Sequence, residues 1–218
     1  MSDALAAAAI PRERWGRRRL AALAEPERRL YRWILTSFRA GDPPTVDDLA
    51  AVAAELDLPL EQTLAKLAHE DLVHHDAARG EITVAYPFSR RPTAHTVRSH
   101  DGSEAFAMCA IDAVGIAPMF GESIAISSRD PLTGEQVQVT LAPEGAGRWL
   151  PAEAVVVCGA SGSGASNSSC CPALNFFASA ASAEGWLAAH GEVQGCVISL
   201  DEAIAAGRAV FGNLLKEE

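Results

Sequence analysis

Apolar residues recur at helical spacing through the first third of the chain and predict three helices there. In the first, Leu30, Ile34 and Phe38 share one face with Trp33, and arginines occupy the other face. The second follows Thr45, which with the acidic residue three positions on resembles a capping box. The predicted helices span residues 26–39, 46–56 and 60–70.

Two short β patterns follow these helices. Residues 72–75 and 82–86 are expected to pair as a hairpin about a turn at Ala78-Arg79-Gly80. Helices followed by a hairpin are typical of a winged-helix module, and Pro87–Pro92 is the expected linker at its end. The would-be recognition helix carries Lys66 among acidic residues, so we expect a structural or docking module that reads no DNA. Histidines fall at 69, 74 and 75, but consecutive strand residues face opposite sides, which favours a surface hairpin over a metal cluster.

The remaining chain mixes strands and helices. The expected strands are 93–97, 123–128, 136–141, 155–158 and 195–200, and the expected helices are 104–114, a short one holding Trp186, and 201–215. A Gly/Ser-rich segment, 159–169, is expected to be a loop. The predicted class is therefore α+β, with an N-terminal winged-helix-like helical domain and a C-terminal mixed, mainly antiparallel domain. The expected units are a basic arm with the first helix (1–41), the module with its linker (42–92), and a catalytic domain (93–218).

Charge is distributed unevenly along the chain. The net charge is −10, and the basic residues concentrate in the arm, so the body is acidic and nucleic acid is not the expected partner. A solvated helical arm is the expected state of five arginines, and a docking surface for a partner or for nucleic acid is the alternative. They are Arg12, Arg14, Arg17, Arg18 and Arg19. The sequence contains no apolar run long enough to cross a membrane, and the arginines follow the first apolar run instead of preceding it, so we expect a cytoplasmic protein with no membrane partner.

Five cysteines suggest thiol chemistry. Their number is odd and they form no Cys-x-x-Cys pair, which favours catalysis or soft-metal binding over a disulfide framework or a zinc ribbon. Cys158 and Cys196 are interpreted as buried strand residues.

The remaining cysteines stand beside other reactive groups. Cys109 and Asp112 are expected on one face near the start of the predicted helix 104–114, where the helix N-terminus should lower the pKa of a thiol. Cys170 and Cys171 end the Gly/Ser-rich segment. A core cysteine and a solvated carboxylate are the plain alternatives for Cys109 and Asp112, and these residues alone leave the function open.

Two motifs at this separation resemble those of the alkylmercury (organomercurial) lyase family. The first is residues 106–113, Phe-Ala-Met-Cys-Ala-Ile-Asp-Ala, followed by Pro-Met-Phe-Gly at 118–121. The second is residues 171–179, Cys-Pro-Ala-Leu-Asn-Phe-Phe-Ala-Ser, with Trp186 downstream, and residues 127–134 resemble the hairpin turn of the family. The resemblance covers residues 93–215, and the winged-helix-like N-terminal domain of the family agrees with residues 26–90.

The resemblance implies a site and a reaction. Cys109 and Cys171 would supply thiolates to mercury, and Asp112 would carry a thiol proton to the carbon leaving group, giving a hydrocarbon and Hg(II) held by these three residues. Cys170 is the alternative second thiol; the register counted back from Phe176 favours Cys171.

Further expectations concern partners and rival functions. No cofactor is expected, because mercury is substrate and product. The expected partners are organomercurials, low-molecular-weight thiols and a mercuric reductase that receives Hg(II). A non-catalytic soft-metal-binding relative, which would not need Asp112, and a thiol-based metal-sensing winged-helix regulator are the alternatives.

Overall fold

The computed structural model describes residues 16–76, 78–160 and 171–215. Its core is an eight-stranded sheet in the order β1-β2-β3-β5-β4-β6-β7-β8, in which every neighbouring pair is antiparallel. The strands are β1 (Val73–Asp76), β2 (Glu81–Ala85), β3 (Phe88–Ser89), β4 (His95–Ser99), β5 (Glu104–Ala107), β6 (Ile124–Arg129), β7 (Gln136–Leu141) and β8 (Gly147–Leu150). A second antiparallel sheet, β10-β9-β11, contains β9 (Val155–Ala160), β10 (Phe176–Phe177) and β11 (Gln194–Ser199).

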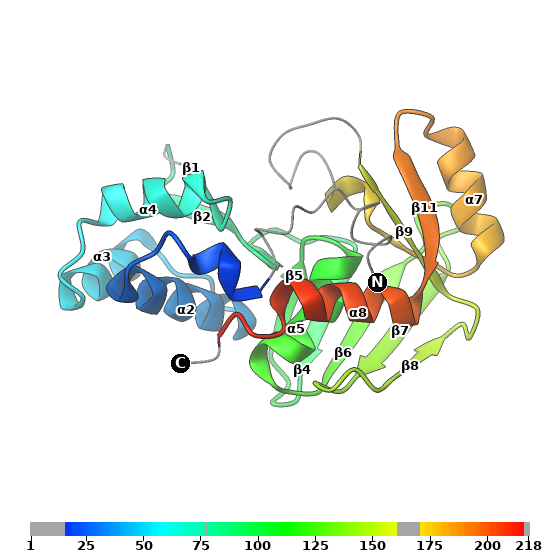
Figure 1. Ribbon diagram of the computed structural model, residues 1–218, viewed down its shortest axis with the longest axis horizontal. Helices are drawn as coiled ribbons and strands as arrows, with labels where there is room; N and C mark the ends of the chain where they lie inside the picture. The colour runs from blue at the N-terminus through cyan, green and yellow to red at the C-terminus, as the bar shows by residue number, and fades with distance from the viewer. Residues whose placement is uncertain (1–15, 77, 161–170, 216–218) are drawn as a thin grey trace.

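Helices lie at both ends of the molecule and across its middle (Figure 1). The helical elements are η2 (Gly16–Leu20), α2 (Glu25–Arg39), α3 (Val46–Glu55), α4 (Leu60–His69), α5 (Ala110–Phe120), η3 (Cys171–Ala173), α7 (Ala180–Ala189) and α8 (Leu200–Phe211). The α2–α4 group lies at one end, and the small sheet with α7 lies at the other. This arrangement confirms the predicted α+β class. Within the described residues, none of the helices is long and apolar enough to cross a membrane.

The N-terminal elements form largely where the apolar pattern predicts them. Leu30, Ile34 and Phe38 are buried on one face of α2. The Thr45 Oγ1 accepts a hydrogen bond from the Asp48 backbone N–H at 3.2 Å, and Asp48 Oδ2 accepts one from the Thr45 N–H at 2.9 Å, which is the expected capping box.

The predicted linker contains a strand. Within residues 87–92, β3 pairs with β2 on one side and β5 on the other, so the N-terminal hairpin continues into the main sheet. The winged-helix comparison and the division into domains remain predictions.

Helices α5 and α8 cross closely at glycines. A Cβ at Gly207 would lie 2.9 Å from the Gly115 backbone N, and one at Gly115 would lie 2.3 Å from a ring carbon of Phe211. Because neither position has room for a side chain, the helices approach closely and fix α5, whose first turn carries the candidate site. The helix α8 is shorter than the predicted span 201–215.

The hairpin β6–β7 has the predicted turn at residues 130–134. Its buried Asp130 accepts hydrogen bonds from the backbone of the turn and from Ala178 N–H, at 2.9 Å, just beyond β10. One carboxylate thus holds the turn and the approach to α7 together. The strand β8 was not predicted.

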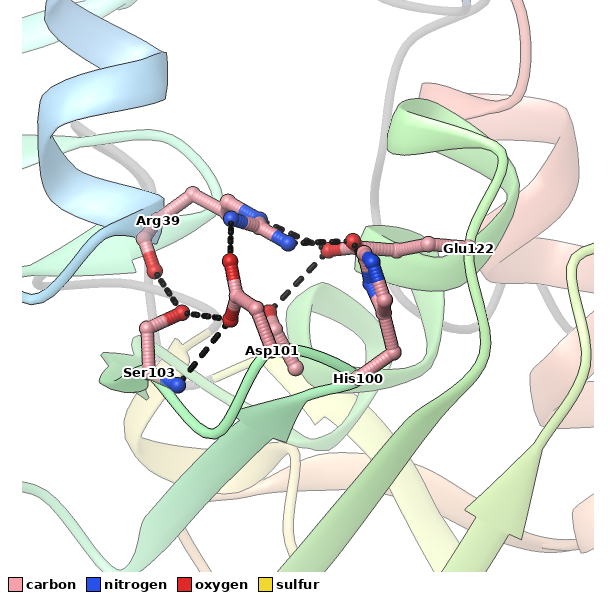
Figure 2. Close-up of polar contacts among 6 residues, drawn as sticks. Arg39, His100, Asp101, Ser103 and Glu122 are labelled. Carbon is pink, nitrogen blue, oxygen red and sulfur yellow. Dashed lines mark hydrogen bonds and ion pairs between the residues drawn. The ribbon is translucent and has the colours of Figure 1, made fainter.

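An ion-pair cluster attaches the end of α2 to the main sheet (Figure 2). The Arg39 guanidinium donates to both Glu122 oxygens, at 2.8 Å from Nε to Oε1, and to Asp101 Oδ2 at 2.6 Å. His100 and Ser99 also hydrogen-bond to Glu122. Burial opposes ionisation of Glu122, but these hydrogen bonds, led by Arg39, keep the pKa of its carboxyl below the ordinary value. We call Arg39, Asp101 and Glu122 the Arg39 clasp.

Candidate active site

Cys109 caps a helix instead of lying inside one. The predicted helix 104–114 is wrong at its start, because residues 104–107 alternate in burial and pair as β5 with β3 and β4. Cys109 has extended backbone angles, φ −155° and ψ 177°, and the helix α5 begins at Ala110. The cysteine therefore occupies the N-cap position of a buried helix.

Asp112 meets Cys109 through this cap. The Cys109 sulfur accepts from the Asp112 backbone N–H at 3.4 Å, and its S–H donates to Asp112 Oδ2 at 2.9 Å. Both residues are buried. The spacing of three residues predicted the contact. It arises because Cys109 caps the helix, whereas both residues were expected on one face inside a helix.

Cys171 approaches the same carboxylate from a segment that is distant in sequence. It is the first residue of η3, and its S–H donates to Asp112 Oδ2 with a sulfur-to-oxygen distance of 3.8 Å. The Ala110 N–H donates to the Leu174 carbonyl at 2.9 Å, which seats the segment after η3 on the first turn of α5. One ligand atom from each of Cys109, Asp112 and Cys171 lies within 4.8 Å of the others. Cys170, the alternative thiol, lies outside the described residues, as do residues 161–169 of the Gly/Ser-rich segment.

Burial governs protonation in this triad. Burial raises the pKa of the Cys109 thiol to about 12, although a hydrogen bond with Cys171 opposes the shift. The expected lowering by the helix N-terminus is therefore wrong, because loss of hydration outweighs it. Burial also raises the pKa of the Asp112 carboxyl to about 6, against hydrogen bonds from the two thiols and the positive charge of Arg19. Near neutral pH the resting site thus pairs a thiol with a carboxylate.

Two sulfurs and one carboxylate constitute a site for a soft cation beside a proton carrier. The sequence profile of the MerB family, alkylmercury lyase, matches residues 88–212 and so includes all three residues. The chain belongs to the alkylmercury lyase family.

Relatives of known name agree with this membership. The chain is 31% identical over 180 residues to an alkylmercury lyase of Staphylococcus epidermidis, covering 82% of this chain and 80% of that protein. It is 28% identical to an alkylmercury lyase of Streptomyces lividans, covering 85% and 83% of the two chains. The crystal structure of the mercury-bound form of MerB2 has the same fold, with a TM-score of 0.72 at 22% identity over 90% of this chain and 95% of that one. This chain is thus an enzyme of the alkylmercury lyase family.

A buried cation from outside the family match acts on the site. Arg19 is 7% exposed, which corrects the prediction that it belongs to a solvated arm. Its Nη2 donates to the Asp71 carbonyl at 3.0 Å, and its guanidinium lies 5.2 Å from the ring centroid of Tyr86 and 5.6 Å from that of Phe211. Arg18 is exposed, as predicted. Arg12, Arg14 and the side chain of Arg17 lie outside what the structure describes.

Tyr86 packs against this cation. It is buried, its hydroxyl lies 3.3 Å from His74 Nε2, and His74 also contacts Asp71 at 3.1 Å. Burial raises the pKa of the Tyr86 phenol, and the negative charge of a Cys171 thiolate would raise it further. Tyr86 therefore stays a neutral hydrogen-bonding group. From sequence, Tyr86 is predicted only as a strand residue, and no motif distinguishes it.

A neutral histidine supports the turn that carries Cys171. Asn175 Nδ2 donates to the Pro172 carbonyl at 2.8 Å and also hydrogen-bonds to His95. His95 is 2% exposed, its Nδ1 lies 2.9 Å from Ser128 Oγ, and burial lowers its pKa to about 4. His95 and Asn175 hold η3 without adding charge. Sequence reasoning missed this pair.

The two remaining described cysteines differ in exposure. Cys158 is buried, as predicted, whereas Cys196 is exposed, and the prediction for it is wrong. Cys196 lies on β11, an edge strand of the small sheet, which leaves its side chain open to solvent. Histidines 69, 74 and 75 form no metal-binding group among the described residues, where the one such group is the triad.

Proposed function

We propose that this enzyme cleaves the carbon–mercury bond of organomercurials with Cys109, Cys171 and Asp112. The observation that carries the proposal is the convergence of two thiols and one carboxylate within 4.8 Å in a buried site. Mercury is a soft metal that prefers thiolates, and the cleaved carbon needs a proton. The three residues supply both requirements.

The first step is exchange of thiols on mercury. An organomercurial bound to a low-molecular-weight thiol, R–Hg–SR′, transfers to one cysteine, and R′SH leaves with the proton of that cysteine. No oxidation is involved, since a mercury–sulfur bond replaces another of the same kind. Cys171 suits this step because its contact with Asp112, at 3.8 Å, is longer than that of Cys109.

The second step moves a proton to carbon. The Cys109 thiol lies 2.9 Å from Asp112, so the carboxylate accepts its proton as the sulfur binds mercury. Two sulfurs on mercury raise electron density at the bonded carbon, and Asp112 then protonates it. The products are R–H and Hg(II) held by Cys109 and Cys171 beside Asp112. A carboxyl pKa of about 6 allows Asp112 both to accept and to give this proton near neutrality.

The scheme uses no cofactor; besides the organomercurial it needs only low-molecular-weight thiols. Hg(II) leaves by exchange with low-molecular-weight thiols or with a thiol-bearing acceptor such as a mercuric reductase. Neither a nucleic acid nor a membrane takes part.

Replacement of Asp112 by asparagine tests the function. Methane released from methylmercury in the presence of excess thiol is the measurement, with wild type and Asp112→Asn compared in a single turnover. We expect a loss of about 10²–10⁴-fold in the variant, because an amide cannot carry the proton. Its Hg(II) binding should persist, since both thiols remain.

Three outcomes would contradict the proposal. Equal methane release by Asp112→Asn would mean that the proton comes from elsewhere. Hg(II) binding by wild type with no methane release would make the chain a soft-metal-binding relative. Specific DNA binding without turnover would favour the metal-sensing regulator.

A further inference from the structure

Two cysteines outside the triad face each other across neighbouring strands. Cys158 lies in β9, the central strand of the small sheet, and Cys196 lies in β11 beside it. They are direct partners in the antiparallel register. Directly opposed residues have Cβ atoms about 4.5–5.5 Å apart on one face of the sheet. Both side chains are thiols, and no disulfide joins them.

The shared face is the one that packs toward the main core. Val156 and Ile198, two positions from the cysteines on their respective strands, belong with Cys158 to the core cluster that includes Cys171. Val157 and Val197 pack on the opposite face with Trp186. Period-two alternation therefore points both thiols toward the side of the sheet that holds Cys171.

Glycines fix the strands closely beside the pair. Gly159 and Gly195 are the next partners in the register. A Cβ at Gly159 would lie 2.8 Å from the Gly195 Cα, and one at Gly195 would lie 2.6 Å from the Cys158 carbonyl oxygen. No side chain can separate the strands here, so the spacing of the two thiols is set by the backbone.

The two thiols differ in access. Cys158 is fully buried, whereas Cys196 is exposed on the edge strand. A soft cation can therefore meet Cys196 from solvent and acquire Cys158 as its second ligand. Two thiols at cross-strand spacing satisfy a soft cation such as Hg(II), which needs no further protein ligand.

We propose that Cys158 and Cys196 form a second site for a soft, thiophilic cation, with Hg(II) as its ligand. Binding is a thiol exchange: Hg(SR′)₂ and two cysteine thiols give a bis-cysteine complex and two R′SH, with no change of oxidation state. The idea that the enzyme itself supplies Hg(II) rests on the proposed function. The affinity of Cys158 and Cys196 for Hg(II) is independent of that function. The site would hold product outside the reacting triad.

The test separates this pair from the other three thiols. A Cys109→Ser, Cys170→Ser, Cys171→Ser background retains only Cys158 and Cys196. We expect it to keep one Hg(II) per chain when loaded with mercuric chloride and desalted in a monothiol, measured by mercury mass spectrometry. Adding Cys196→Ser should abolish this binding. Adding Gln194→Ala, at an exposed position of the same strand, should leave it unchanged.

The natural background provides a second measurement if the triple variant folds poorly. Cys196→Ser alone should bind one Hg(II) fewer than wild type and should release methane from methylmercury at the wild-type rate in a single turnover. Equal mercury content in Cys196→Ser and wild type would overturn the proposal. The proposal would also be overturned if the reduced Cys158–Cys196 pair takes up no Hg(II), even though oxidation can join the two thiols in a disulfide. Absence of methane from every variant would defeat the proposed function and leave this stoichiometry intact.

Discussion

At the scale of single residues, burial keeps the Cys109 thiol of the triad protonated near neutral pH. Burial holds the pKa of Cys109 at about 12 and that of Asp112 at about 6, so near neutrality the proton stays on sulfur. A protonated, buried thiol reacts slowly with oxidants and alkylating agents, since the thiolate is the nucleophile. In the mechanism that we propose, mercury binding removes that proton, and Asp112 lies 2.9 Å away to receive it. The proposed reaction would thus be started by the metal itself.

The second thiol can be assigned by paired substitutions. Cys171→Ser should abolish methane release from methylmercury, because a hydroxyl is a poor ligand for a soft metal, and the Cys171 sulfur is the one that approaches Asp112. Cys170→Ser should retain most of the wild-type rate. Circular dichroism of both variants controls for folding. An inactive Cys170→Ser beside an active Cys171→Ser would exchange the two roles.

The two motifs in the sequence predicted the three residues of the triad. Spacing and helix geometry by themselves predicted less of the site. The spacing of Cys109 and Asp112 indicated a contact, but nothing local placed Cys171 beside them. The protonation state was also mispredicted, because the effect of a helix N-terminus is visible in sequence whereas burial depends on the whole fold. His95 and Asn175 were missed for the same reason, since their contact joins β4 to a segment that is distant in sequence.

At the scale of elements, the main error concerns the approach to α5. Residues 104–114 are rich in alanine and apolar side chains, and their composition suits a helix. Pairing with β3 and β4 makes residues 104–107 a strand, and Cys109 then starts the helix as its cap. The short strand β3 was not predicted, because two residues between prolines are too few to show any periodicity. Tertiary pairing determines both elements.

The Arg39 clasp should stabilise the attachment of α2 measurably. Arg39 and Glu122 side chains are only 15% and 11% exposed. Arg39→Met should therefore lower the free energy of unfolding at neutral pH by about 2–4 kcal/mol, because it leaves a largely buried carboxylate without its partner. Urea denaturation is the measurement. Arg98→Met is the matched control, since the Arg98–Glu104 pair is 64% and 50% exposed and should contribute less than about 1 kcal/mol.

The same clasp has a defined pH dependence. The folded-state pKa of Glu122 is lowered, so its stabilisation is present above the ordinary carboxyl pKa and is lost as the pH falls through the folded value. The difference in stability between wild type and Arg39→Met should shrink in acid. A difference that is equally large after Glu122 is protonated would mean that the clasp acts through packing of the arginine stem alone.

At the scale of the whole molecule, the N-terminal segment contributes to the electrostatics of a site that lies in the other half of the chain. The family match begins at residue 88, yet Arg19 precedes it and its positive charge lowers the pKa of Asp112. No local pattern distinguishes Arg19 from the exposed Arg18, since both belong to one run of arginines. Only the packing of η2 against α8 and of the guanidinium over Tyr86 buries one of them. A domain boundary drawn from sequence therefore hides this coupling.

Arg19 should set the lower pH limit of the reaction. Asp112 must be ionised to accept the thiol proton, so methane release should rise with pH through the pKa of Asp112, about 6. The positive charge of Arg19 lowers that pKa. Arg19→Met should therefore raise it and move the rising limb of single-turnover rate against pH upward, by about one pH unit or less. Arg19→Lys retains the charge and should restore the wild-type profile, and Arg18→Met, at the exposed neighbour, should not move it. An unshifted limb in a folded Arg19→Met variant would limit Arg19 to a packing role against Tyr86 and Phe211. An equal shift in Arg19→Lys would attribute the effect to the lost hydrogen bond to Asp71 instead of to charge.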